Sequence, residues 1–177
     1  MKLKIILAVV AMFASITNAS FAARGTDGNV SIVYWQAPSI LNPYLSSGTK
    51  DIESASLVIE PLGRYTETGA LVPFLAKEIP TVANGGVSPD LTSITWTLQE
   101  GLLWSDGTPV TSADVKFSAD YCMHPEGGCS QLAKFDGIKS ISIPDDLTIV
   151  VTFEGPMPNP YGPFMGGQTP IIQKAQF

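Results

Sequence analysis

Histidine is nearly absent from this sequence: the 177-residue chain contains a single one, His124. One imidazole excludes metal sites built from several histidines and leaves only one base for a Ser-His-Asp triad. The chain also has neither a Gly-x-Ser-x-Gly nucleophile elbow nor a His-Glu-x-x-His zinc motif. These absences argue against most hydrolase mechanisms.

Basic residues are also few. Lys and Arg number 10 against 16 Asp and Glu, which gives a net charge of -6. Nucleic-acid binding depends on a positively charged surface, so DNA and RNA partners are not expected. Internal repeats, heptads and long low-complexity tracts are absent as well, and the 45% hydrophobic, 15% charged composition is that of an ordinary globular domain.

The only long apolar run lies at the start of the chain. Lys2 and Lys4 precede apolar residues 5–14, and small residues Ser20 and Ala22 follow at the positions that a signal peptidase reads. Ten apolar residues are about half of what a membrane-spanning helix needs. The pattern predicts a secretory signal peptide, residues 1–22, cleaved to leave a soluble periplasmic protein. Ala23 rather than a cysteine follows, so no lipid anchor is expected.

The chain has only two cysteines, Cys122 and Cys129, which bracket a short segment containing proline and glycine. Because export leads to an oxidising compartment, this spacing favours a local disulfide. A ring this short stabilises a loop more than the whole fold, by about 2 kcal/mol. The alternative is a metal site formed by Cys122, His124 and Cys129, for which no fourth ligand is evident.

Apolar periodicity predicts short strands and helices in the mature chain. Ile94, Trp96 and Leu98 alternate with threonines, as in a half-buried strand. Thr111 followed by Asp114 is the pattern of a capping box at the start of a helix. In chain order, the predicted elements are a strand at 29–35, a short helix from residue 49 towards 61, a hairpin within 62–74, a strand at 94–98, a helix at 112–122 and a hairpin within 138–153.

The last segment, residues 155–177, is rich in proline and has no clear period. Ile171 and Ile172 could begin a strand. The chain then stops at Phe177 without closing an element, so we expect it to be the front part of a longer protein.

Several segments together resemble the extracytoplasmic solute-binding proteins of family 5, the peptide, dipeptide and nickel receptors of ABC importers. The resemblance covers nearly all of the mature chain, and its most specific part is the run from Thr95 to Val115. Gln99 departs from the family pattern, which usually has a basic residue there. The segments that carry the resemblance are Leu41-Asn42-Pro43, Ser47-Gly48-Thr49, Ile59-Glu60-Pro61-Leu62, residues 71–76 and residues 95–115.

This resemblance implies an α/β fold of the periplasmic binding protein type II kind, a two-lobed hinged receptor built from a mixed sheet with hairpins and short helices. Residues 23–177 are then the N-terminal part of the solute-binding domain, without the second lobe. The implied function is non-enzymatic: a monomeric receptor captures a peptide or peptide-like solute and delivers it to ABC permease subunits at the inner membrane. No cofactor or metal is implied.

Three short segments are the candidate ligand-binding residues. Trp35 and Gln36 end the predicted first strand, where open α/β sheets present ligand contacts; the alternative is a core tryptophan before a turn. Ser47, Gly48 and Thr49 combine small hydroxyls with exposed backbone at a helix start, which suits a ligand carboxylate or peptide carbonyl. The alternative is that they only cap the helix. Gly167 and Gln168 belong to the segment Gly166-Gly167-Gln168, whose glycines permit close approach of the backbone to a ligand. The alternative is an ordinary flexible loop.

Other polar residues have structural explanations. Strand, turn and cap chemistry account for Trp104, Asp106 and Asp114, and Asp51 complements the dipole in the first turn of its helix. Two other functions remain open: a small secreted hydrolase acting on glycans or peptides, and a secreted adaptor that binds a partner through its proline-rich tail.

Overall fold

The computed structural model describes residues 28–29 and 31–177, so the predicted signal peptide, residues 1–22, lies outside the described residues. The chain divides into two units, Met1–Tyr34 and Trp35–Phe177. The described part of the first unit contains neither helix nor strand, and the elements below all belong to the second. Within the described part of the chain, no helix has the length and apolar character needed to cross a bilayer.

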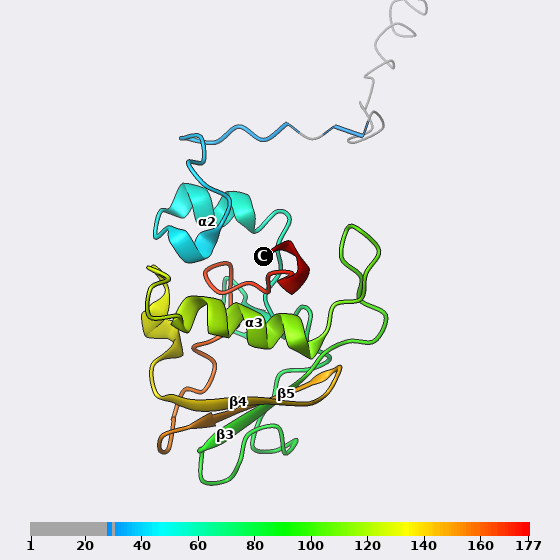
Figure 1. Cartoon of the computed structure of the whole chain (residues 1–177), viewed down its shortest axis with the longest axis vertical. Coiled ribbons are helices and arrows are strands. Elements are labelled where there is room, and N and C mark those ends of the chain that lie inside the picture. The colour runs from blue at the N-terminus through cyan, green and yellow to red at the C-terminus, as the bar shows by residue number, and fades with distance from the viewer. Residues whose placement is uncertain (1–27, 30) are drawn as a thin grey trace, which may run out of the picture. The chain divides into compact units, whose positions relative to one another are not determined.

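The larger sheet has three antiparallel strands in the order β3-β5-β4 (Figure 1). Their bounds are Ser93–Thr97 for β3, Ile138–Asp145 for β4 and Thr148–Phe153 for β5. In β3, Ile94 and Trp96 point to the buried face opposite Val151 and Ile149 of β5, so the predicted alternation is confirmed. β4 is an edge strand, and most of its residues are exposed, including Ile143.

Helix α3, Ser112–Met123, packs against β4 and β5 (Figure 1). The predicted capping box is confirmed: the N–H of Thr111 donates to Oδ2 of Asp114 at 2.9 Å. Val115, Ala119 and Cys122 form the buried face that the sequence spacing predicts. A short 3-10 helix, η2 (Leu132–Phe135), follows the helix and its disulfide loop.

The N-terminal part of the second unit is built from short elements. They are the 3-10 turn η1 (Pro43–Leu45), helix α2 (Thr49–Ala55) and the antiparallel hairpin of β1 (Gly63–Tyr65) and β2 (Leu71–Pro73). The predicted helix start and hairpin are confirmed. The helix ends earlier than its spacing suggested, and Val58 is exposed instead of continuing a buried face.

The proline-rich tail returns to the start of this unit and passes between α2 and α3 (Figure 1). It runs parallel to β1: the N–H of Leu62 donates to the carbonyl of Phe164, and the N–H of Gly166 donates to that of Gly63, both at 2.9 Å. Ile171 and Ile172 are buried, yet they form no strand. Their N–H groups bond instead to other segments, before a last 3-10 turn, η3 (Lys174–Gln176).

The predicted opening strand at residues 29–35 is wrong for its described residues. Ile32, Val33 and Trp35 are exposed, Val33 at 99%, and the segment joins neither sheet. Alternating apolar residues form a strand only where a neighbouring strand pairs with them and a core covers one face. Among the described residues, no strand pairs with this segment.

Candidate functional site

An open, extended stretch of backbone precedes α2. Ser46 (φ -143°, ψ 142°) and Gly48 (φ -75°, ψ 127°) are both extended, and Ser47 between them is exposed. Within the described residues, the N–H and C=O of Ser47 and the N–H of Thr49 make no hydrogen bond. Solvent-accessible backbone groups in extended geometry can pair with the main chain of another extended segment. We call residues Ser46 to Thr49 the open segment.

Asp51 fixes this open segment from the helix side. Its carboxylate is only 3% exposed and accepts hydrogen bonds from the hydroxyl of Ser46 at 2.7 Å and the N–H of Ser39 at 2.6 Å. The N–H of Ile40 and the ammonium of Lys50 also donate to it. The sequence alone predicts only that Asp51, in the first turn of the helix, complements the helix dipole. Its larger role is to hold the residues before α2 against the helix.

Because of these contacts, the stability of the protein is expected to depend on pH in the acid range. The Lys50 ammonium and the Ser46 hydroxyl hold the pKa of the Asp51 carboxyl well below its usual value of 3.8, with smaller contributions from the backbone N–H groups. A lowered pKa stabilises the folded state above the usual value, and the stabilisation is lost as the pH falls through the folded-state pKa.

We expect Asp51→Asn to lower the free energy of unfolding by a constant amount near neutral pH, and the difference from wild type to shrink below about pH 4. Denaturant unfolding of both proteins across the acid range measures this. Other carboxyls with a lowered pKa, such as Asp90 and Asp106, titrate in both proteins. Their contributions cancel when the free energy of unfolding of the variant is subtracted from that of wild type. A difference that stays constant into strong acid would contradict this role of Asp51.

The other two predicted ligand-binding pairs lie on two further segments of the chain. Trp35, 69% exposed, and Gln36 lie on the irregular stretch that leads towards Ser39. Gly167 lies against the later part of α2, where a Cβ atom would clash with the Ser56 hydroxyl oxygen. Close approach to a helix thus explains this glycine, while the side chain of Gln168 is exposed beside it. Ser47, Gly48 and Thr49 thus lie on the open segment, and each of the two pairs lies on another segment of the chain.

A cavity of about 340 Å³ lies where several distant motifs meet. Asn42, Ile59 and Trp104 come from three of the segments that carry the family resemblance, and the tail completes the wall with Gln173 and three other residues. The lining is Asn42, Ile59, Trp104, Ser105, Ile172, Gln173, Gln176 and Phe177. An apolar wall with a few amides and a hydroxyl suits a small polar organic ligand better than a metal ion.

Hydrogen bonds keep the walls of this cavity in place. The indole N–H of Trp104 donates to Asp114 at 3.3 Å, and the N–H of Lys174 donates to the other oxygen of the same carboxylate at 2.9 Å. The amide of Gln173 donates to Asp106 at 2.7 Å. These bonds agree with the structural roles predicted for Asp106 and Asp114, and they show that the tail depends on both carboxylates.

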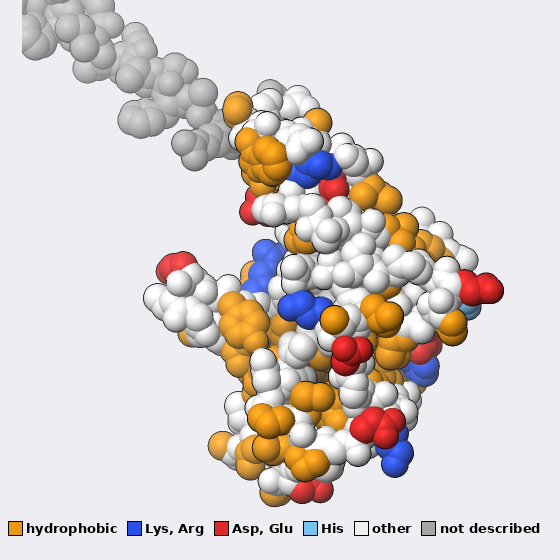
Figure 2. Space-filling model, turned by 90° about the vertical axis from the view of Figure 1, so that its left-hand side faces the viewer, with side chains coloured by type: hydrophobic (Ala, Val, Ile, Leu, Met, Phe, Trp, Pro, Cys, Tyr) orange, Lys and Arg blue, Asp and Glu red, His pale blue; other side chains and the backbone are white. Residues whose placement is uncertain are grey.

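A smaller hollow of about 210 Å³ shares Trp104 and Ser105 with this cavity. Its rim carries the exposed apolar side chains Leu57, Val58 and Leu103. Figure 2 shows a face of the molecule on which hydrophobic side chains lie among scattered charges of both signs, without a block of basic residues.

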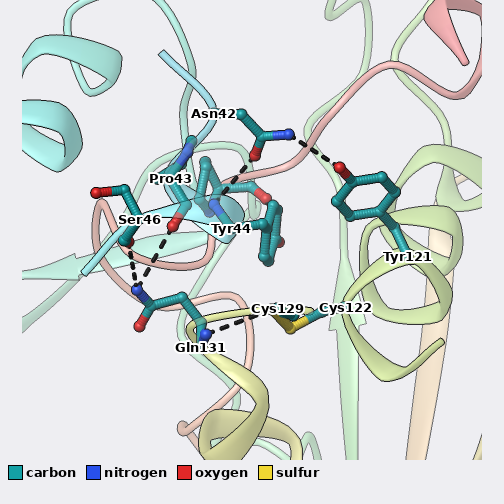
Figure 3. Close-up of a disulfide and its surroundings, with 9 residues drawn as sticks. Asn42, Pro43, Tyr44, Ser46, Tyr121, Cys122, Cys129 and Gln131 are labelled. Atoms are coloured by element: carbon teal, nitrogen blue, oxygen red, sulfur yellow. Dashed lines mark hydrogen bonds between the residues drawn. A yellow bond between two sulfur atoms is a disulfide. The ribbon is translucent and has the colours of Figure 1, made fainter. Parts of the chain in front are cut away.

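The predicted disulfide is confirmed: Cys122 and Cys129 are joined, with their Cα atoms 5.1 Å apart (Figure 3). Both sulfurs are consumed in this bond, so the alternative metal site with His124 is wrong for this structure. His124 instead accepts a hydrogen bond from the N–H of Glu126 at 3.2 Å.

Sequence reasoning missed two residues that hold the site. Asn42 was noted only as part of a motif, but its side chain joins the N–H of Tyr44 to the hydroxyl of Tyr121. Gln131 was not noted at all, although it is buried and bonds to the backbone before α2. The Asn-Pro pair is a local turn signal that could have indicated the first role. Nothing local marks the second.

Comparison with known proteins identifies the family. The family described as bacterial extracellular solute-binding proteins, family 5, matches residues 70–176. This chain belongs to that family. The resemblance stated from the motifs is therefore confirmed.

Curated relatives of this family 5 chain include Protein XP55 of Streptomyces lividans, 32% identical over 142 residues, which cover 79% of this chain and 24% of that protein. A probable peptide ABC transporter periplasmic-binding protein of Sinorhizobium fredii, y4tO, is 38% identical over 77 residues, covering 43% of this chain and 14% of that protein. The family 5 chain thus spans a quarter or less of the length of these relatives.

Solved structures confirm the fold class. AgaA of A. tumefaciens R10, in complex with agropinic acid, matches 78% of this chain and 27% of its own with a TM-score of 0.69 and 28% identity. OppA of Haemophilus influenzae, in complex with the peptide RPPGFSPFR, matches with a TM-score of 0.68 at 20% identity, covering 78% of this chain and 29% of its own. The family 5 chain has the fold of a part of a type II periplasmic binding protein.

Proposed function

We propose that this chain is the front part of a periplasmic receptor that captures a peptide or peptide-like solute and delivers it to the permease of an ABC importer. The observation that carries the proposal is the open segment of a family 5 member, in which the N–H and C=O of the exposed Ser47 and the N–H of Thr49 make no hydrogen bond among the described residues. The names of the curated relatives, which include periplasmic peptide-binding proteins, support the same solute class.

The physical argument begins with the ligand. An extended peptide offers N–H and C=O groups at a regular spacing, whatever its side chains are. A receptor that pairs with them through its own backbone accepts many sequences. Each such hydrogen bond contributes only about 1 kcal/mol net, so useful affinity requires several of them and exclusion of water by a second lobe.

We assign the parts of the chain accordingly. Residues 1–22 are the cleaved signal peptide, and residues 23–177 are the first part of the solute-binding domain of a monomeric receptor. Ser47, Gly48 and Thr49 are the principal ligand contacts, and Trp35, Gln36, Gly167 and Gln168 are further candidates that a closed receptor would bring to the same solute. The receptor binds its solute without chemical conversion.

Equilibrium binding to the whole natural protein that carries this chain tests the proposal. Intrinsic tryptophan fluorescence is titrated with a short alanine-rich peptide and with the same peptide N-methylated along its backbone. We expect saturable binding of the first peptide and a loss of about tenfold or more for the second, because each methyl group removes a main-chain donor.

Mass spectrometry of the same mixtures gives the complementary result. We expect the peptide to remain intact, as it does in a receptor. Cleavage products would favour the secreted hydrolase instead. Equal affinity for the two peptides, or saturable binding of opines or nickel chelates alone, would contradict main-chain recognition of peptides.

A further inference from the structure

Gln131 holds the open segment at Ser46 (Figure 3). Its side chain is 6% exposed, and its amide donates to the carbonyl of Ser46 at 3.0 Å and to that of Pro43 at 3.4 Å. Ser46 is thus bonded through its carbonyl to Gln131 and through its hydroxyl to Asp51. The hydroxyl also accepts the N–H of Gly48 at 3.0 Å. Two side chains far apart in the sequence therefore fix the residue that precedes Ser47.

The disulfide fixes Gln131 in turn. The N–H of Gln131 donates to Sγ of Cys129 at 3.4 Å, and the N–H of the preceding Ser130 donates to the carbonyl of Tyr44 at 2.7 Å. Cys122, the other half of the disulfide, lies in the last turn of α3. The bridge therefore ties Gln131 to the helix that packs on the main sheet.

A second connection joins the disulfide loop to the turn η1. Tyr121, next to Cys122, accepts a hydrogen bond from the side-chain amide of Asn42 at 3.1 Å. Its ring also lies edge-on to that of Tyr44, with 6.0 Å between centroids. The residues on both sides of the disulfide loop thus hold the turn that leads into the open segment.

We infer that Gln131 is a positioning residue for ligand binding and that the Cys122–Cys129 disulfide holds Gln131 in place. It keeps Ser46 in place and so presents the backbone N–H and C=O of Ser47 and the N–H of Thr49 to a ligand. The inference rests on the proposed function for its consequence, but the positioning itself can be measured without any ligand.

The test compares Gln131→Met with Gln99→Met in the whole natural protein. Gln99 is the control for lost hydrogen bonds, because its side-chain amide also donates to two backbone carbonyls, those of Phe74 and Ala76, although Gln99 is exposed and Gln131 is buried. Hydrogen exchange of the amides of Gly48 and Asp51 reports positioning, and exchange in β3 and β5 reports the global fold. We expect faster exchange at residues 48 and 51 and about fivefold weaker peptide binding in Gln131→Met alone.

Gln131→Glu adds a readout that packing alone would not change. An ionised carboxylate cannot donate to the carbonyl of Ser46, whereas the protonated acid can, and burial raises the pKa of such a group. Peptide affinity of this variant, relative to wild type at each pH, is expected to recover between about pH 7.5 and pH 5. Gln131→Met is expected to show no recovery.

The outcomes separate the inference from the proposed function. Unchanged exchange at residues 48 and 51 in Gln131→Met would overturn the positioning role, even if wild type binds peptide. Faster exchange with unchanged peptide affinity would overturn the link between this segment and the ligand. If wild type binds no peptide, the proposed function fails, while faster local exchange with intact β3 and β5 would still support positioning by Gln131.

Discussion

Replacing Thr49 by proline is expected to weaken peptide binding about tenfold and to leave the stability of the protein almost unchanged. Thr49 is the first residue of α2, and its N–H has no hydrogen-bond acceptor among the described residues. Proline is well tolerated at this helical position, where its fixed φ matches the helix and no intrahelical bond is lost. Gly48 before it is already extended, as the residue preceding a proline should be.

Thr49→Ala is the matched control, because it removes the exposed side chain and keeps the N–H. We expect its affinity to lie close to that of wild type. Titration calorimetry with a short peptide, together with thermal unfolding, gives both quantities. Equal binding by the proline and alanine variants would show that the N–H of Thr49 does not contact the ligand.

Replacing Gly63 by valine is expected to lower the free energy of unfolding by about 3 kcal/mol. Gly63 is buried in β1, and a Cβ atom there would lie 2.8 Å from the sulfur of Met165 and 3.0 Å from the backbone carbonyl of Val72. The methionine can move, but the carbonyl belongs to the paired strand β2. The carbonyl of Gly63 also accepts a hydrogen bond from the N–H of Gly166 in the tail. A valine side chain at position 63 would push the tail away and weaken this bond.

Gly155→Val is the control for the general effect of adding a side chain to a glycine, since a Cβ atom there meets nothing within 4 Å. Its expected effect is within about 0.5 kcal/mol of zero. Urea denaturation of the three proteins measures the difference. If Gly63→Val were as stable as Gly155→Val, the close contact between β1 and the tail would not be required for folding.

Local patterns predicted the elements that depend on neighbours in sequence. The alternation around Trp96 is enough for a half-buried strand, and Thr111 with Asp114 is enough for a helix start. The disulfide was predictable for the same reason, because Cys122 and Cys129 are only seven residues apart. In each case the interaction that decides the structure lies within a few residues of its signal.

Non-local contacts explain the predictions that failed or were incomplete. The segment ending at Trp35 has the composition of a strand, but a strand needs a partner, and neither sheet formed by the described residues pairs with it. Ile171 and Ile172 are buried as a strand would be, yet their backbone bonds go to Glu60 and to the hydroxyl of Ser118. Their apolar character is typical of buried residues, but it could not predict which groups would accept the hydrogen bonds.

The sequence by itself determined the family, the disulfide, the strand and helix pattern from β3 to β5 and the location of the candidate contacts Ser47, Gly48 and Thr49. Only the tertiary structure decided that Asp51 and Gln131 both bond to Ser46, the residue before those contacts, and that the tail closes a cavity beside Trp104. The physical reason is that a propensity or a spacing acts over a few residues. A buried amide that bonds to a carbonyl 85 positions away has no trace in its own neighbourhood until the chain has folded.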